Sequence, residues 1–194
     1  MAKNGKSAET KQLKSHVDPF RVDGSKEFHL KSHKPDEKGG LDKESASRII
    51  DVNRGRLREL QEKLYAHDRW SVLLIFQGMD ASGKDGIARA MCGAMNPMIL
   101  RMAAFGVPTK PELRHDFLWR ITRELPERGR VGLFNRSHYE DVLVVRVHEL
   151  VPRDVWEARY DEINAFEKEL VDSGTTLVKC ALFVSLDEQK RRLA

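Results

Sequence analysis

Residues 72–86 read VLLIFQGMDASGKDG and carry the strongest structural signal in the chain. The first five residues form a short continuous apolar run, which is typical of a strand buried on both faces of a parallel sheet. A glycine-rich turn follows over 78–86, and apolar residues at helical spacing mark a helix from Ile87 to Met95. A buried strand, a glycine-rich turn and a helix in this order predict a phosphate-binding loop in an α/β domain.

The spacing inside the turn supports this prediction. Gly78 and Gly83 enclose four residues, and Lys84 follows directly. Glycines allow backbone N–H groups to converge on one point, and the helix N-terminus adds partial positive charge. The alternative is a plain connector between a strand and a helix. The loop residues predicted to bind phosphate are Gly78, Ala81, Ser82, Gly83, Lys84, Asp85 and Gly86.

Two acids in this loop point to a divalent cation. The common pattern has Ser or Thr after the lysine to hold Mg²⁺, but Asp85 stands there, and Asp80 lies inside the loop. A carboxylate in a phosphate cradle repels the ligand unless a metal ion lies between them. Asp80 is therefore a candidate Mg²⁺ residue, either directly or through water.

The rest of the chain alternates strands and helices. Thr109–Glu112 has the pattern of a capping box, which predicts a helix whose apolar face runs to Leu125. Strands alternating with helices argue for a parallel sheet flanked by helices. The other expected helices are 43–67, 154–173 and one from 187, and the other expected strands are 100–105, 131–134 and 177–184.

A second group of polar residues follows the expected strand 131–134, where parallel sheets bind ligands. Asn135, Arg136, Glu140 and Asp141 offer oxygen ligands for a metal and a cation for a phosphoryl group, which phosphoryl transfer requires. The alternative is a charged surface loop. His138 is expected to donate a hydrogen bond rather than act as a base, because an attacking phosphate oxygen is already anionic.

Composition excludes several classes of protein. The chain has 194 residues and a formal net charge of +4, of which residues 1–40 carry 9 − 6 = +3. We read 1–40 as a flexible basic arm and 41–194 as the domain that carries the phosphate-binding loop, and nucleic-acid binding by the domain is not supported. No apolar run is long enough to span a bilayer, no secretory signal is evident, and Cys92 and Cys180 form no disulfide framework. A cytoplasmic protein is expected.

Five motifs in order resemble the family-2 polyphosphate kinases. They are GMDASGKDG at 78–86, FGVPT at 105–109, FLWR at 117–120, FNRSHYEDVLVVRV at 134–147 and VP…W…RY…FE at 151–167. The resemblance implies a P-loop kinase-like fold similar to thymidylate kinase. It also implies reversible, Mg²⁺-dependent transfer of a phosphoryl group between inorganic polyphosphate and nucleotides. The motif with Asn135 resembles the subgroup that phosphorylates both nucleoside mono- and diphosphates.

The resemblance also assigns roles to residues. Asp80, Lys84, Arg136 and Asp141 would be catalytic, and Asp80, Asp141 and Glu140 would hold the metal, because many relatives have a metal-binding Asp where Asn135 stands. Arg120 would point its guanidinium at a nucleotide phosphate; the alternative is a charge on a helix surface.

Two further groups are expected near the substrates. The segment with Arg101, Val107, Pro108 and Thr109 follows a strand end and is expected to border the nucleotide pocket, unless it is an ordinary turn. Arg159, Arg191 and Arg192 resemble the start of a helical lid, unless they belong to a solvated helix face. By the same resemblance, the chain is expected to stop a few residues into that lid.

Two other functions fit the phosphate loop alone. One is a nucleoside or nucleotide kinase that uses ATP as the donor, and the other is a non-catalytic module that binds polyphosphate or nucleotides. The resemblance favours the polyphosphate-dependent transferase for AMP and ADP, with GMP and GDP as further acceptors, and it implies a homodimer or homotetramer.

Overall fold

The computed structural model describes residues 13–194, in two compact units that divide between Asp51 and Val52. The first unit contains two short 3₁₀ helices, η1 (Asp18–Phe20) and η2 (Leu30–Ser32), and the beginning of helix α2 (Lys43–His67). Residues 1–12 of the predicted arm lie outside the described residues. The division at Asp51 falls inside α2, and the domain boundary at residue 40 stays a prediction.

The second unit is built on a four-stranded parallel sheet in the order β2-β3-β1-β4. Its strands are β1 (Ser71–Gly78), β2 (Leu100–Ala104), β3 (Val131–Asn135) and β4 (Thr175–Leu182). Because all four strands run in the same direction, their carboxyl ends meet at one edge of the sheet. The loops that leave these ends contain most of the predicted site residues.

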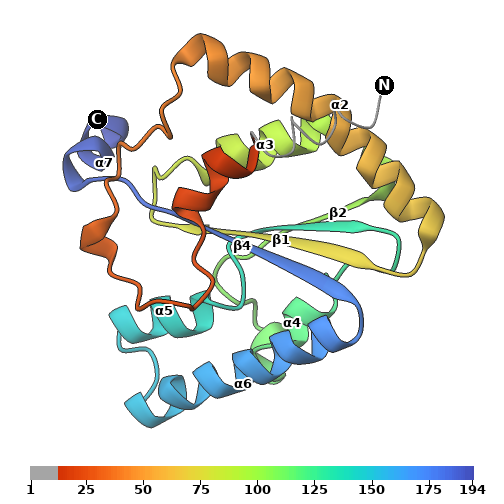
Figure 1. The fold of residues 1–194 in the computed structure, drawn as a ribbon. Coiled ribbons are helices and arrows are strands. Elements are labelled where there is room, and N and C mark those ends of the chain that lie inside the picture. Colours follow the sequence, from red (N-terminus) through yellow and green to blue (C-terminus); the bar gives the residue numbers. More distant parts are fainter. Residues whose placement is uncertain (1–12) are drawn as a thin grey trace. The chain divides into compact units, whose positions relative to one another are not determined.

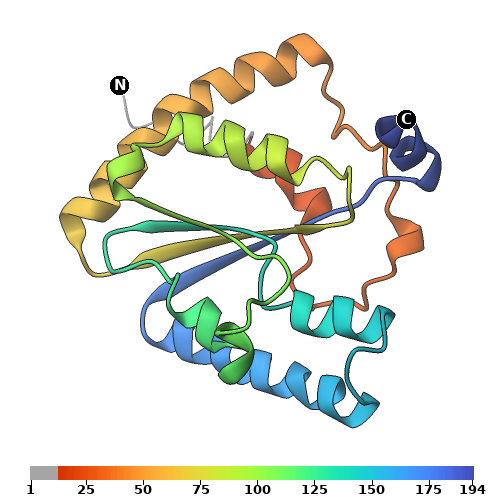
Figure 2. The same cartoon turned by 180° about the vertical axis from the view of Figure 1, so that it is seen from behind.

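Helices cover both faces of this sheet. In Figures 1 and 2, α3 (Lys84–Ala94) lies on one face, and α5 (Glu140–Val147) and α6 (Arg153–Asp172) lie on the other. Side chains of β1 alternate between the two layers: Leu73 and Ile75 pack with residues of α6, and Phe76 packs against Ala88 of α3. The remaining elements of this unit are η3 (Pro97–Ile99), η4 (Glu112–Arg114), α4 (Trp119–Thr122) and α7 (Leu186–Leu193).

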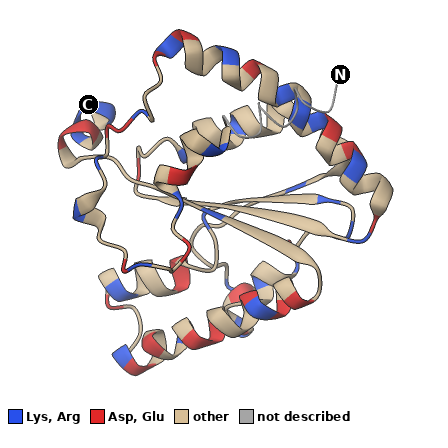
Figure 3. Ribbon diagram, viewed as in Figure 1, with Lys and Arg blue, Asp and Glu red and all other residues tan. Residues whose placement is uncertain are grey.

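Charge separates the sheet from its helices. Figure 3 shows strands almost free of charged residues and helices marked by both signs; the only charges in the four strands are Arg101 and Lys179. Burial between two helical layers explains the apolar runs of β1 and β3. The predicted parallel α/β fold is therefore confirmed.

One predicted helix forms only as two short pieces, η4 and α4. The capping box of Thr109 and Glu112 forms, with the Glu112 carboxylate accepting from the Thr109 N–H at 2.6 Å. It opens only the short η4, and Leu113 is 70% exposed instead of joining the core. Asp116 interrupts the helix because its carboxylate accepts from the Leu118 N–H at 2.8 Å, a local bond that competes with the helical one.

The sequence prediction also omitted α5, although it placed functional residues there. The predicted helix 43–67 is confirmed, and the predicted helix 154–173 is shifted by one residue at each end. No helix among residues 13–194 is both long and apolar enough to cross a lipid bilayer.

Candidate functional site

The loop after β1 is closely packed around Gly78. A Cβ atom at Gly78 would lie 2.7 Å from the Leu182 carbonyl oxygen and 2.7 Å from Ser82 Oγ, so the backbone passes where no side chain fits. Gly83 has φ 99° and Ala81 has φ 61°, both in the left-handed region. A non-glycine residue in this conformation is strained, which is common in loops that bind ligands.

Lys84 is the first residue of α3 and is 6% exposed. Its ammonium donates to the Met79 carbonyl oxygen at 3.3 Å and lies 3.7 Å from Asp80 Oδ1. These partners are weak for a buried cation. A phosphate group in the loop would supply the missing negative charge.

Arg136 brings a second cation to this loop. It follows β3 with φ 63°, and its Nη2 donates to Asp80 Oδ1 at 3.0 Å. Its Nη1 lies 3.7 Å from Glu140 Oε2. The structure thus brings Asp80, Lys84, Arg136 and Glu140 together from the loops after β1 and β3.

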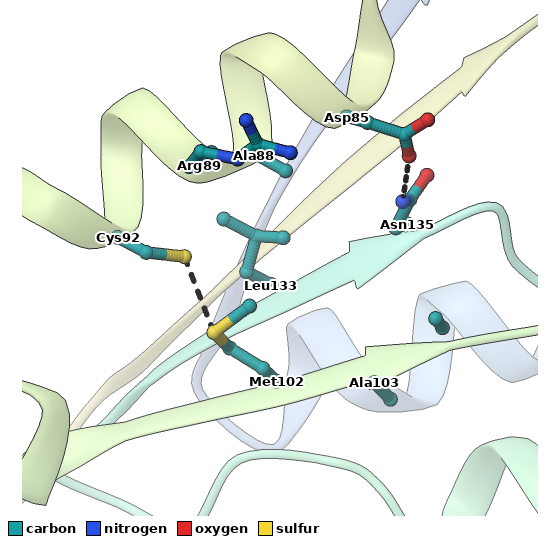
Figure 4. A pocket seen from close by; sticks show the side chains of 9 residues that line it. Asp85, Ala88, Arg89, Cys92, Met102, Ala103, Leu133 and Asn135 are labelled. Atoms are coloured by element: carbon teal, nitrogen blue, oxygen red, sulfur yellow. Dashed lines mark hydrogen bonds between the residues drawn. The ribbon is translucent and has the colours of Figure 1, made fainter.

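Asn135 and Asp85 form a pair beside this group. The Asn135 amide nitrogen donates to Asp85 Oδ1, while Asn135 Oδ1 is buried without a hydrogen-bond partner among the described residues. Figure 4 shows the pair at one end of a pocket of about 440 Å³ whose other end is apolar, with Cys92 and Met102. Arg89 also lines this pocket, a position that sequence reasoning did not single out.

Arg120 and Asp141 form a buried ion pair rather than the separate roles expected of them. The Arg120 guanidinium donates to Asp141 Oδ2 at 2.8 Å and to the Gly106 carbonyl oxygen at 2.8 Å. The side chains are 6% and 10% exposed. In this arrangement Arg120 is committed to Asp141 and to the loop after β2, and the Asp141 carboxylate already has a cation.

The segment after β2 is divided between the surface and a second pocket. Phe105 and Thr109 line a pocket of about 370 Å³ together with Trp119, Arg120 and Arg123. Val107 is 93% exposed, and Pro108 connects it to Thr109. Arg101 does not line this pocket itself, but its guanidinium pairs at 2.8 Å with Glu124, which does.

The three predicted lid arginines lie in different places. Arg192 of α7 donates to the Ala81 carbonyl oxygen at 2.9 Å, which brings it to the phosphate loop. Arg191 pairs with Glu188 on its own helix, and Arg159 of α6 donates to the Asp141 carbonyl oxygen at 2.7 Å. Sequence reasoning missed Gln189, which donates to the Asp80 carbonyl oxygen at 2.9 Å.

Sequence reasoning also missed a polar cluster around Glu167. The carboxylate of Glu167 contacts His138, Tyr139 and Lys179. Burial alone would raise the pKa of Glu167, but hydrogen bonds from these three side chains outweigh it and lower the pKa to about 2. Two features of the sequence could have indicated this cluster: Glu167 is a carboxylate on the apolar stripe of α6, and Lys179 is the one charged residue of β4.

The oxygen atoms at this edge of the sheet decide whether the predicted metal ion can bind. No group of three His, Cys, Asp or Glu side chains close enough to hold a metal ion occurs in residues 13–194. Mg²⁺ often takes only one or two protein carboxylates and completes its shell with water and phosphate oxygens. The carboxylates of Asp80 and Asp85, with the unpaired Asn135 Oδ1, suit that mode of binding.

Comparison with known proteins gives consistent matches. The family model described as Polyphosphate kinase 2 (PPK2) matches residues 40–194. The chain is 47% identical over 176 residues to the AMP/ADP-polyphosphate phosphotransferase of Meiothermus ruber, covering 90% of this chain and 66% of that protein. It is 47% identical over 162 residues to the ADP-polyphosphate phosphotransferase of Rhodopseudomonas palustris, covering 77% and 56%.

A solved structure matches as well. The crystal structure of Polyphosphate Kinase 2 from Arthrobacter aurescens TC1 superposes with a TM-score of 0.87 at 43% identity, covering 91% of this chain and 64% of that chain. The chain spans less than two thirds of the length of each of these three proteins.

Proposed function

The chain belongs to the polyphosphate kinase 2 family, and from that premise we propose that the protein transfers phosphoryl groups between inorganic polyphosphate and the adenine nucleotides AMP and ADP. The observation that carries the proposal is the convergence of Lys84 and Arg136 on Asp80 at the carboxyl ends of β1 and β3. The names of the relatives from Meiothermus ruber and Rhodopseudomonas palustris supply the substrates.

Phosphoryl transfer requires the protein to position the reactants and to neutralise charge, and it does not require a general base. The attacking phosphate oxygen is already anionic, so rate comes from alignment of the reactants and neutralisation of charge on the transferred group. Lys84 and Arg136 supply two positive charges from adjacent loops. His138 is fully buried, so it is not available to a substrate as a base.

Mg²⁺ fits the oxygens on this edge of the sheet. We propose that Asp80 holds it, with Asp85 and Asn135 as further oxygen donors, and Glu140 as another acid within the group. When bound, the ion would neutralise negative charge on the phosphate groups. Asp141, which was predicted to hold the metal, pairs with Arg120 at 2.8 Å, so we propose that its carboxylate holds the Arg120 guanidinium in place instead.

The nucleotide is proposed to occupy the pocket bordered by Phe105, Thr109 and Arg123. The pocket is lined by aromatic side chains, Phe105 and Trp119, on which a base can stack, and by the Arg123 guanidinium, which suits its phosphates. Such stacking discriminates weakly between purines, so GMP and GDP are proposed as further acceptors.

A matrix of donors and acceptors tests the proposal. Polyphosphate or ATP is combined with AMP, ADP, GMP or GDP in the presence of Mg²⁺, and products are separated by chromatography. We expect ADP and ATP to form from AMP with polyphosphate as the donor. Transfer from ATP alone would favour the ATP-dependent kinase, and binding of polyphosphate without turnover would favour the binding module.

The cytoplasmic location stays a prediction from composition, and the homodimer or homotetramer stays a prediction of the family resemblance. Light scattering of the purified protein checks the oligomer, since its mass would be two or four times that of the 22.3 kDa chain.

A further inference from the structure

A cluster of four polar side chains lies outside the proposed transfer chemistry. His138 and Tyr139 come from the loop between β3 and α5, Glu167 from α6, and Lys179 from β4. Burying a carboxylate is costly unless it is paired and hydrogen-bonded, and Glu167 is 7% exposed. Its partners therefore indicate what the carboxylate holds in place.

Glu167 joins these segments through both of its oxygens. Oε1 accepts from the Tyr139 hydroxyl at 2.7 Å and lies 3.3 Å from His138 Nε2, and Oε2 accepts from the Lys179 ammonium at 2.6 Å. The Lys179 ammonium also donates to the Tyr139 hydroxyl at 3.0 Å. Because an ionised carboxylate can only accept, His138 carries its proton on Nε2.

The loop that Glu167 contacts contains Arg136, the proposed catalytic cation. His138 and Tyr139 lie between Arg136 and Glu140 in the chain. On the other side, Gln77 of β1 bonds both Ser137 and Glu140. The loop is thus held from β1 through Gln77 and from α6 and β4 through Glu167.

We propose that Glu167 is a positioning residue for phosphoryl transfer, and this inference rests on the proposed function. It fixes the loop after β3 so that Arg136 meets Asp80 at the phosphate loop. Arg136 has a backbone in the left-handed region, a conformation that persists only when its surroundings hold it. Without the Glu167 carboxylate, His138 and Tyr139 lose their link to α6, while the contacts of Gln77 with Ser137 and Glu140 remain. We infer that the Arg136 guanidinium then loses its fixed place.

Glu167→Gln tests this with little change of shape. The variant keeps the volume but loses the charge, and its amide offers one accepting oxygen to the three donors. We expect kcat to fall about ten- to a hundredfold, in line with the cost of small misplacements, while KM for the nucleotide stays within about threefold. The matched control is Glu169→Gln on an exposed turn of the same helix, which we expect to keep the wild-type kcat.

If Glu167→Gln unfolds near the assay temperature, a milder variant can be tested in its place. Tyr139→Phe removes only the hydroxyl that donates to Glu167. If both residues act through one contact, the loss of kcat in the double variant is smaller than the product of the two single losses. Multiplicative losses, or a kcat in both variants equal to that of the Glu169→Gln control, would overturn the inference.

Hydrogen–deuterium exchange separates this inference from the proposed function. In Glu167→Gln we expect faster exchange of the amides of residues 136–141 and unchanged exchange of residues 84–94 in α3. Unchanged exchange in the loop, or a uniform rise across the chain, contradicts a positioning role even if the enzyme is slow. A wild-type protein that transfers no phosphate from polyphosphate refutes the proposed function, whatever the exchange experiment shows.

Discussion

Lys84 is deeply buried but has weak partners. Its substitution is therefore the clearest test of the proposed phosphate site. Within residues 13–194, its ammonium has as partners the Met79 carbonyl oxygen at 3.3 Å and Asp80 at 3.7 Å. Lys84→Met keeps the stem of the side chain and removes the charge. We expect kcat with polyphosphate to fall at least about a hundredfold, because an electrostatic donor is lost. The free energy of unfolding should change by less than about 1 kcal/mol, because no strong ion pair is broken.

Steady-state kinetics and urea unfolding measure the two effects on the same preparation. Lys168→Met is the control, since Lys168 is exposed on α6 and pairs with its helical neighbour Asp172. A Lys84→Met enzyme with at least half the wild-type kcat would remove this residue from the proposed machinery.

Gly78 tests the packing of the phosphate loop. A Cβ atom there would meet the Leu182 backbone oxygen and Ser82 Oγ at 2.7 Å, so Gly78→Ala must displace the loop or the end of β4. We expect a loss of about 1–3 kcal/mol in unfolding free energy, together with weaker binding of polyphosphate. Gly93→Ala in α3 is the opposite case, because a Cβ atom there would meet no atom within 4 Å from other parts of the described chain, and alanine favours the helix. Thermal melting should show a fall for the first variant and no fall for the second.

Asn135 tests the proposed cation site. Asn135→Asp replaces the amide that donates to Asp85 with a second carboxylate, so two like charges meet. We expect the variant to melt below the wild type without a metal ion and to gain more from Mg²⁺, since binding to the folded state raises the melting temperature. Melting at increasing Mg²⁺ concentration measures this without turnover. Equal Mg²⁺ shifts in both proteins would place the ion elsewhere.

The strands show what could be predicted from local pattern. The runs at 72–76 and 131–134 are apolar because helices cover both faces of the sheet, and the pattern indicates this directly. The helix predicted after Thr109 failed although its capping box forms, because the Asp116 side chain captures the Leu118 N–H. A side chain that competes with the backbone bond outweighs helical periodicity over one short segment.

Glu167 also links α6 to β4, and the contribution of this link to folding stability depends on pH. Its pKa is lowered from 4.5 to about 2, so its ionised form stabilises the folded state above pH 4.5. That contribution, at most about 3 kcal/mol, is lost as pH falls through about 2. We expect the difference in unfolding free energy between the wild type and Glu167→Gln to shrink between pH 4.5 and 2. Urea unfolding across this range measures it, and a difference that stays constant would argue against the low pKa.

The order of the strands in the sheet determines which residues that are distant in the sequence lie close together. Asp80 and Arg136 are 56 positions apart, yet they meet because β1 and β3 are neighbours in the sheet. Motif spacing located both residues in loops at strand ends, so their proximity could be predicted. The pairing of Arg120 with Asp141 could not, because it depends on how the loop after β2 folds against α5. The residue types were enough to predict the chemistry of the site, but the tertiary structure was needed to show which side chains pair with one another.

The uneven distribution of charge supports a last prediction. Residues 1–40 carry +3 of the net +4, whereas every proposed site residue lies at Gly78 or beyond, and the family model begins at residue 40. A variant without residues 1–39 should therefore keep kcat within about twofold. Its KM for long polyphosphate should rise at about 0.05 M salt and return to the wild-type value at about 0.5 M, because salt screens attraction between separated charges. Kinetics at the two salt concentrations measure this. A fall in kcat at both would show that the basic segment takes part in the transfer itself.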